Sequence, residues 1–534
     1  MYSLHYPAVL VDALHDSKFR GILFLGWYWQ TPDFSWRRAE EKRTRSWSLR
    51  LLFIALASAM AVQLLLGAWL IYAWFRYRLA GGWEFGLVLI ISYPLVWANI
   101  LGIATAVCNL FEVKRNGRLL LCWVLEHQVR RLRKRYQFVV VAVAGSVGKT
   151  SSKLAIAKVL ATEKRVAYQE GNYNDRLTVP LVVFGQDRPA SLFDVLGWVK
   201  VIARNQRVIR RGYAYDVAVV ELGTDGPGQI AEFAYLQPDI AVVTAIAPEH
   251  MEYFGSLDAV AKEELGVAAF SHTLLINTDD IAVKYRSDLT TATTYSLADG
   301  GDYTAAYRLA TDLKGEDVTF HLRGSTHDAK IAYLGAHGVK VVLSAVAVAD
   351  MLGMEPAKSI AAAQKLAPFA GRMQLLEGKN KSTIIDDTYN SSPVAAKAAL
   401  DVLYQTKTSK RIAILGSMNE MGESSQAAHE EVGAYCDPTK LAAVATVGAE
   451  ANQYLAPAAI KRGCMVVEFM SPYEAGEWAV KQLEPRTVVL AKGSQNGVFT
   501  EESVKCLLAN PSDESKLVRQ SKYWLARKRK QFPH

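Results

Sequence analysis

The sequence predicts an α/β fold with two doubly wound domains, the first of them a P-loop domain, preceded by a hairpin of two membrane-spanning helices. Two long apolar runs without a charged residue lie near the N-terminus. From residue 136 onward, short apolar runs alternate with stretches of helical length, as in parallel sheets that are covered by helices on both faces. The glycine-containing stretch VAVAGSVGKTSS (141–152) joins the first short run to the stretch that follows it.

The two long apolar runs cover residues 51–75 and 85–111 and are 25 and 27 residues long. A helix needs roughly 20 apolar residues to cross a bilayer, so each run is long enough. The short connector 76–84 makes the pair a hairpin, and Trp and Tyr lie near the ends of the runs, where interfacial anchors are common. Two buried core helices are the alternative, but uncharged runs of this length are uncommon in soluble cores.

Positive charge is concentrated at the two ends of the chain. The net charge of +9 divides into +10 for residues 1–135, −6 for 136–510 and +5 for 511–534. Six Lys/Arg in residues 37–50 and eight in 112–135 flank the hairpin, and the positive-inside rule places both flanks in the cytoplasm. The acidic middle argues against a nucleic-acid enzyme, whose folded domain would carry a basic stripe.

These observations predict a membrane anchor over residues 1–135, with the aromatic-rich residues 1–36 at the membrane interface. The basic tail 511–534 is either an amphipathic helix on the membrane surface or a solvated end. The five cysteines are scattered and form no C-x-x-C pair, so the sequence indicates neither a zinc site nor a disulfide framework. This cysteine usage fits a reducing compartment.

The remaining chain divides into two α/β domains. In the central domain, residues 136–375, buried parallel strands are expected at 138–145, 217–223, 240–246 and 273–279, and alternating short strands at 302–335. In the C-terminal domain, residues 376–510, strands are expected at 382–388, 411–417, 441–448, 464–470 and 487–493.

The glycine-containing loop has the composition of a phosphate site. It is two residues shorter than the common G-x-x-x-x-G-K-[ST] loop, because Val143 stands where that pattern has glycine. Glycines let the backbone approach phosphates, whose charge the N–H groups and the helix N-terminus favour. Lys149 would reach the outer phosphates and Thr150 would offer its hydroxyl to Mg²⁺. The loop residues expected to bind the nucleotide are Gly145, Ser146, Gly148, Lys149, Thr150 and Ser151.

Two further metal-ligand candidates follow neighbouring strands. Glu221 ends the apolar run VAVVE, and His250 comes shortly after IAVVTAI. In open α/β sheets, ligands gather beyond the carboxyl ends of the strands, so both side chains are expected near the loop. A single histidine is usually structural, but this position makes His250 a metal candidate.

Seven stretches in order resemble the Mur ligase family, and within it most resemble the type that adds D-alanyl-D-alanine to a peptidoglycan precursor. They include AGSVGKTSSK (144–153), EGNYNDRLTVPLVV (170–183) and the long stretch 221–261, which begins ELGTDGPGQ. The others are GRMQ (371–374), IDDTYNSSPVAAKAAL (385–400), AILGSMNEMGE (413–423) and LAKGS (490–494). The shortened phosphate loop is itself typical of this family.

The resemblance implies an ATP-dependent carboxylate–amine ligase. ATP would phosphorylate a carboxylate, and an amine would attack the acyl phosphate to form an amide. The cofactors implied are ATP and Mg²⁺. By position, the resemblance assigns catalysis to Lys149, Glu221, His250 and Arg372; metal binding to Thr150, Glu221, His250 and Glu264; nucleotide contacts to Arg372, Asp387, Tyr389 and Asn390; and substrate contacts to Asn172, Asn174, Lys492 and Ser494.

The chain departs from the family at several of its positions. Glu264 stands where the family usually has a lysine that is carbamylated to bind a second Mg²⁺. Gly338 and Val341 replace asparagines, and Ser417 replaces a common aspartate. Asp225 and Gly226 replace an Asn-His pair near the substrate. These changes are expected to alter the binding of the second Mg²⁺, the contacts with the nucleotide and the choice of substrate.

The largest departure is at the front, where a membrane hairpin stands in place of the family's UDP-binding domain. The leading hypothesis is therefore a ligase anchored in a bacterial-type inner membrane, with its catalytic domains in the cytoplasm. Its substrates would be a lipid-linked or polymeric carboxylate of the cell envelope and an amine or amino acid, with membrane partner subunits and no nucleic acid. One alternative is an ATP-binding or ATPase subunit of a membrane synthesis or export complex, similar to poly-γ-glutamate synthases. Another is a scaffold for membrane enzymes.

Overall fold

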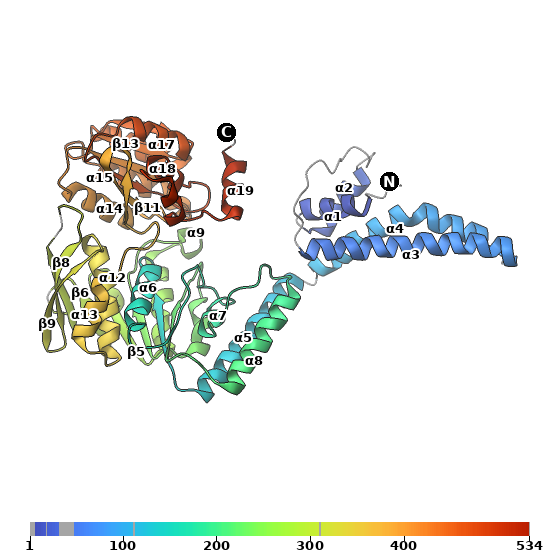
Figure 1. Ribbon diagram of the computed structural model, residues 1–534, viewed down its shortest axis with the longest axis horizontal. Helices are drawn as coiled ribbons and strands as arrows, with labels where there is room; N and C mark the ends of the chain where they lie inside the picture. Colours follow the sequence, from blue (N-terminus) through green and yellow to red (C-terminus); the bar gives the residue numbers. More distant parts are fainter. Residues whose placement is uncertain are drawn as a thin grey trace. The chain divides into compact units, whose positions relative to one another are not determined.

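The computed structural model describes residues 6–17, 19–30, 47–78, 80–110, 113–298, 300–308 and 311–532. Most of the predicted basic flank 37–50, and parts of the predicted interfacial segment 1–36, lie outside these residues. The chain forms two compact units (Figure 1): Met1–Leu125 with Arg188–Arg204, and Glu126–Asp187 with Asn205–His534. We refer to them as the anchor unit and the catalytic unit, after the membrane anchor and the catalytic domains that the sequence predicts.

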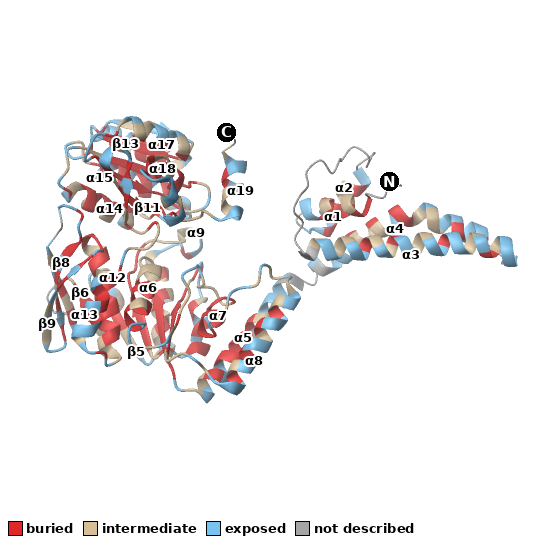
Figure 2. Cartoon of the chain, in the orientation of Figure 1, coloured by how far each residue is buried: buried red, intermediate tan, exposed pale blue. Residues whose placement is uncertain are grey.

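The anchor unit is helical. Its helices are α1 (Tyr6–Asp16), α2 (Gly21–Gln30), α3 (Trp47–Tyr77) and α4 (Gly82–Leu110), followed by the first halves of α5 (Val113–Arg135) and α8 (Val195–Arg211). Within α3 and α4, the segments Leu49–Tyr77 and Gly82–Val107 are long and apolar enough to cross a membrane. Only about a fifth of each segment's most apolar window is buried, at 17% and 22%, and Figure 2 shows exposed residues along both helices. Large apolar side chains such as Leu65 and Ile91 are among the exposed ones.

Small residues let α3 and α4 approach closely. A Cβ built on Gly86 would lie 2.5 Å from the Gly67 carbonyl oxygen, so neither position accepts a side chain without separating the helices. Gln63 adds polar contacts, because it donates to the Leu89 carbonyl (3.0 Å) and accepts from the Trp97 indole N–H (2.6 Å). Helices α1 and α2 cover part of this pair through a core that includes Leu10 and Phe24.

The catalytic unit begins with a nine-stranded sheet in the order β2-β3-β1-β4-β5-β6-β7-β8-β9. The strands are β1 (Val139–Ala144), β2 (Val166–Ala167), β3 (Val217–Glu221), β4 (Ile240–Val243), β5 (Thr273–Asn277), β6 (Thr293–Ser296), β7 (Tyr303–Arg308), β8 (Glu316–Leu322) and β9 (Ser325–Ile331). Pairing is parallel from β2 to β7 and antiparallel from β7 to β9. The short strands expected over 302–335 therefore extend the edge of the same sheet.

Helices cover both faces of this sheet. They are α6 (Lys149–Leu160), α7 (Val179–Val183), α9 (Met251–Phe254), α10 (Leu257–Leu265), α11 (Val283–Arg286), α12 (Gly335–Met351) and α13 (Pro356–Gln364). One core joins Val141 and Val219 of the strands to α6 and α12, and the other joins alternate strand residues such as Val140 to α7. The uninterrupted Val/Ala runs of the strands reflect this burial on two faces.

The C-terminal domain holds a six-stranded sheet in the order β10-β11-β15-β12-β13-β14, parallel except for β10. Its strands are β10 (Gln374–Gly378), β11 (Ser382–Asp387), β12 (Arg411–Gly416), β13 (Ala443–Val447), β14 (Val466–Phe469) and β15 (Val488–Lys492). Its helices are α14 (Pro393–Gln405), α15 (Ser425–Tyr435), α16 (Ala456–Lys461), α17 (Pro472–Lys481), α18 (Glu501–Leu507) and α19 (Lys522–Gln531). The predicted α/β fold class is confirmed.

The basic tail is not a solvated end, because part of it packs on the C-terminal domain through a buried lysine. Lys528 of α19 is fully buried and pairs with Glu501 (2.8 Å) and Glu502 of α18. Arg519 pairs with Glu501 at 2.7 Å and donates to the carbonyls of Thr388 and Tyr389. The tail is anchored because two of its cations neutralise carboxylates that are buried in α18.

Candidate active site

The phosphate loop leaves β1 and turns sharply into α6. Gly145 and Gly148 have φ of +117° and +89°, which side-chain-bearing residues rarely adopt. A Cβ on Gly145 would lie 2.5 Å from the Thr244 hydroxyl, so this position has no room for one. The same hydroxyl donates to the Val147 carbonyl (2.7 Å), and the Ser146 N–H donates to the Ala245 carbonyl (2.8 Å). The end of β4 therefore holds the loop in shape.

Lys149, the first residue of α6, lies among carboxylates. Its ammonium is 3.5 Å from Glu249 and 3.4 Å from Glu264. Burial alone would lower the pKa of Lys149, but the negative charges of Glu249, Glu264 and Glu221 outweigh this effect and raise it. The surrounding carboxylates therefore favour the charged form of Lys149 at the mouth of the loop.

Glu264 lies directly behind the phosphate loop. Its side chain is fully buried, and its second oxygen accepts from the Gly145 N–H at 2.7 Å. Burial raises the pKa of Glu264 to about 7, an effect that Lys149 opposes and Glu249 reinforces. Both carboxylate oxygens thus contact the phosphate loop. Among the residues that the structure describes, no three His, Cys, Asp or Glu side chains are gathered as a metal site.

Thr150 and Glu221 form a hard-oxygen pair suited to Mg²⁺. The Thr150 hydroxyl donates to one oxygen of Glu221 (3.1 Å). Lys153 is 3.2 Å from the other oxygen, which is buried and accepts no hydrogen bond from any described residue. Hydroxyl and carboxylate oxygens are the ligands that Mg²⁺ prefers, so these residues fit the metal that the sequence implied. Asn174 lies beside them, 3.5 Å from Glu221.

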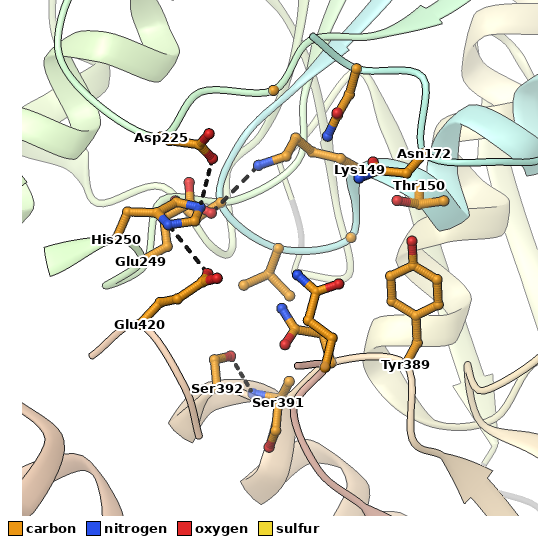
Figure 3. A pocket seen from close by; sticks show the side chains of 18 of the residues that line it. Lys149, Thr150, Asn172, Asp225, Glu249, His250, Tyr389, Ser391, Ser392 and Glu420 are labelled. Carbon is orange, nitrogen blue, oxygen red and sulfur yellow. Dashed lines mark hydrogen bonds and ion pairs between the residues drawn. The ribbon is translucent and has the colours of Figure 1, made fainter. Parts of the chain in front are cut away.

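His250 lies between carboxylates from two domains (Figure 3). One ring nitrogen is 3.5 Å from Asp225 and the other is 3.4 Å from Glu420, which belongs to the C-terminal domain. His250 and Glu420 have positive φ values, +45° and +66°. Gly422 lies close to the backbone of Glu252 in α9, so the two domains touch here. The Glu420–His250 pair therefore joins the domains at the edge of the site.

The C-terminal domain closes the other side of the site. The Arg372 guanidinium stacks on the Tyr389 ring at 4.2 Å, and the Tyr389 N–H donates to the Gly371 carbonyl (3.0 Å). Lys492 is buried and pairs with Asp387 at 2.5 Å. Its ammonium also donates to the Asn390 carbonyl at 3.1 Å, which ties β15 to the loop after β11.

Two cavities meet at the phosphate loop, with volumes of about 350 Å³ and about 520 Å³. Of the predicted residues, the smaller cavity is lined by Ser146, Gly148, Lys149, Thr150, Asn172, Asn174, Glu221, His250, Arg372, Tyr389 and Asn390. The larger is lined by Gly148, Ser151, Arg372, Asp387 and Lys492, with Tyr285, Tyr295 and Tyr333 among its aromatic walls. Gly145, Glu264 and Ser494 line neither cavity. Ser494 is buried and accepts from the Asn419 N–H (3.0 Å).

Sequence reasoning missed several residues of the site. Glu249 faces Lys149, and its place next to His250 in PEH could have indicated it. Glu420 and Asn419 line the smaller cavity, and they belong to the stretch AILGSMNEMGE (413–423), from which the resemblance assigns no site residue. Lys340, which pairs with Asp280 (2.8 Å) at the larger cavity, had no local signal because its partner lies 60 residues away.

Comparisons with known proteins agree with this geometry. Residues 143–349 match the model of the Mur ligase middle domain, and residues 371–495 match that of the Mur ligase glutamate ligase domain. The UDP-N-acetylmuramoyl-tripeptide--D-alanyl-D-alanine ligase of Bacillus subtilis is 27% identical over 380 residues, which cover 70% of this chain and 76% of that protein.

Two solved structures have a similar fold. MurF from Acinetobacter baumannii superposes with a TM-score of 0.60 and 23% identity, covering 72% of this chain and 79% of that one. MurF from Thermotoga maritima in complex with ADP superposes with a TM-score of 0.59 and is 21% identical in sequence. The match covers 74% of this chain and 84% of that one. The two family models together span more than half of the chain, including the phosphate loop and both walls of the site. The chain therefore belongs to the Mur ligase family, whose members are ATP-dependent amino acid ligases.

Proposed function

We propose that this protein is a membrane-anchored ligase that uses ATP to join a carboxylate to an amine on a cell-envelope precursor or polymer. The observation that carries the proposal is the smaller cavity, where the phosphate loop and Glu221 of the central domain face Tyr389, Asn390 and Glu420 of the C-terminal domain. A site between two domains can close around a reactive intermediate and exclude water from it.

The two cavities suggest how ATP is oriented. The larger one has tyrosine walls and adjoins Ser151 at the start of α6, which suits a nucleoside. The smaller one contains Lys149, Thr150 and Glu221, which suits the transferred phosphoryl group. In this orientation the triphosphate crosses Gly148, where backbone N–H groups and the N-terminus of α6 favour anionic oxygens.

Residues of the smaller cavity then support phosphoryl transfer to the carboxylate substrate. Lys149 neutralises charge on the transferring group, because its neighbouring carboxylates keep it protonated. Thr150 and Glu221 would hold Mg²⁺, which supplies further charge neutralisation when bound. His250 is a proposed metal ligand: one ring nitrogen would bind the metal, and a neighbouring carboxylate would accept from the N–H of the other. Stacking on Tyr389 holds the Arg372 guanidinium at the border of both cavities.

The far end of the smaller cavity favours an amine. Asp225, Glu249 and Glu420 gather near His250. Lys149 beside Glu249 offsets only one of these three carboxylates, so this end carries a net negative charge that attracts an ammonium group. Asn172 and Asn174 line the same cavity and offer amide groups to the substrates. An amine bound here lies beside the proposed phosphoryl site, where it can attack the acyl phosphate.

The anchor supports a substrate held at a bilayer. Two long helices have many exposed apolar side chains, and basic residues flank them on both sides. A carboxylate that belongs to a lipid-linked precursor or a membrane-associated polymer would remain near such an enzyme. With this anchor, the catalytic unit would lie in the cytoplasm, beside the inner membrane.

The test measures phosphate release and amide formation by the detergent-purified full chain with ATP, Mg²⁺, pooled amino acids and membrane extract. Lys149→Ala should abolish both, whereas Lys158→Ala, a lysine on the same helix that lines neither cavity, should keep them. No phosphate and no new amide from the unaltered protein would refute the ligase proposal. ATP hydrolysis without an amide product would instead favour an ATPase subunit of a membrane complex.

A further inference from the structure

Helices α5 and α8 carry an apolar surface in their first halves, which belong to the anchor unit. Six large apolar side chains are between 45% and 67% exposed there: Leu119, Leu120, Trp123, Val195, Leu196 and Val199. Phe193, just before α8, is also exposed. We call the six residues the apolar patch. Exposed apolar side chains gathered in this way usually mark an interaction surface.

The two halves of the patch lie at the same level because α5 and α8 run in the same direction. Further along the helices, the Asn205 amide donates to Gln128 (2.9 Å) and Arg131 donates to Gln206 (3.1 Å). Arg135 then donates to the Arg210 carbonyl (3.3 Å). These pairs are separated by 75 to 77 residues, and the same offset places 119–123 of α5 beside 194–198 of α8. Figure 1 shows the two helices side by side.

Positive charge surrounds the patch. Residues 113–135 contain eight Lys/Arg and one acidic residue. Residues 188–211 contain six Lys/Arg and one acidic residue. Both acidic residues are engaged, since Glu126 is buried against Arg176 and Asp194 accepts from the Gly197 N–H. On α8 the apolar residues are followed by exposed Lys200 and Arg204 and by further exposed arginines in the later turns. The surface therefore has an apolar tip and a cationic flank.

The position of the patch in the chain limits what can cover it. Helix α4, the second candidate span, ends at Leu110, and α5 begins at Val113. Leu119 follows Val113 by six residues, or roughly 9 Å of helix at about 1.5 Å per residue. If α4 crosses a bilayer, the patch starts within reach of the layer where headgroups meet acyl chains.

We infer that the α5–α8 patch inserts into the headgroup region of an anionic bilayer and forms a second, interfacial attachment of the protein. This inference rests on the proposed membrane anchoring. An apolar tip with a cationic flank, in which the described parts of α5 and α8 carry far more basic than acidic residues, matches lipid acyl chains beside anionic headgroups. A nucleic acid would use the cations but would leave the apolar tip in water.

The attachment bears on the catalytic unit through the chain itself. Helix α5 leads within four residues to β1, which carries the phosphate loop, and α8 leads to β3, which ends at Glu221. These two strands are neighbours in the sheet. Two helices fixed at the interface would therefore restrain both the loop and its carboxylate, whereas a single flexible tether would not.

The test places an environment-sensitive NBD fluorophore at Leu196→Cys in the full chain, reconstituted in nanodiscs of phosphatidylcholine with or without phosphatidylglycerol. Lys461→Cys, an exposed position of α16, is the matched control. The unaltered chain is labelled in parallel to measure labelling of its own cysteines. In anionic nanodiscs we expect a blue-shifted emission and a several-fold loss of iodide quenching at position 196, and neither change at position 461. Val199→Cys gives a second reading if the first variant folds poorly.

Other outcomes separate this inference from the anchor itself. If carbonate extraction leaves the unlabelled chain in the bilayer but the label at 196 stays open to iodide, the patch inference fails and the anchor stands. If the chain is extracted, the proposed anchor fails. Equal insertion in neutral and anionic nanodiscs overturns the role of the cationic flank. Shielding of the label in detergent, with cross-linking to a second copy, means that protein covers the patch, which also overturns the inference.

Discussion

Replacing Lys528 with methionine should loosen the part of the C-terminal domain that borders the nucleotide site. Lys528 and Arg519 face Glu501 and Glu502, and the four side chains are at most 7% exposed. Methionine keeps most of the lysine stem, so the change mainly removes one charge. Breaking a buried ion pair by removing one partner costs about 3–5 kcal/mol. Because Arg519 still compensates one carboxylate, we expect Lys528→Met to lower the local stability by about 3 kcal/mol, the lower end of this range.

Hydrogen exchange of the full chain, followed by mass spectrometry, measures this loss locally. An opening free energy lowered by about 3 kcal/mol corresponds to exchange that is roughly 100-fold faster in α18 and in the loop that carries Tyr389. Lys530→Met, an exposed change on the same helix, should leave exchange unchanged. Lys528→Met with Glu502→Gln should restore much of the protection, because charge balance returns. Unchanged exchange in Lys528→Met, or no recovery in the double variant, would refute the reasoning.

Three further changes test other parts of the molecule. Glu264→Lys puts a second buried cation beside Lys149, so ATP turnover should fall and should partly recover with bicarbonate if carbamylation restores a carboxylate; unchanged turnover would mean that the position is idle. Burial raises the pKa of Asp386 to about 6 from an ordinary 3.8, so its ionisation should cost stability as the pH rises between these values. Asp386→Asn should therefore melt at a higher temperature than the unaltered protein. This difference should grow as the pH rises from 3.8 to about 6 and level off above it. A difference that does not change with pH would contradict this. Gly86→Leu would place its Cβ 2.5 Å from a carbonyl of α3, so the solubilised protein should melt earlier in detergent, whereas Gly26→Ala, with no atom within 4 Å of the new Cβ, should not change the melting temperature.

The fold could be predicted where its signals are local. The strands β1, β3, β4 and β5 fall inside the predicted apolar runs, because burial on both faces leaves a continuous Val/Ile/Ala run. The two-residue β2 and the polar β6 (TTYS) went unpredicted, since neither is long or apolar enough to stand out. Pairings between distant residues left no trace in the sequence pattern. Glu420 reaches His250 across 170 positions, and Lys528 enters a core although its neighbours suggest a solvated helix.

In the candidate site, too, some residues could be placed from the sequence, whereas the contacts of others could not. The phosphate loop, Thr150 and Glu221 could be placed from the motif and from the strand ends, since topology brings the carboxyl ends of parallel strands together. The contacts of Glu264 could not be placed in this way. The position of a residue in a motif shows that it lies near the loop, but the length of the side chain decides whether it contacts Gly145 and Lys149 or a metal.

The anchor unit and the catalytic unit are interleaved in the chain. Residues 188–204 lie inside the stretch that matches the Mur ligase middle domain, yet they belong to the compact unit that holds the apolar helices. A simple head-to-tail gene fusion would have left the boundary at a single point. An engineer who wants the catalytic unit without the apolar helices would therefore have to redesign this internal segment as well as delete the front of the chain. A lineage that lost these helices would face the same double change.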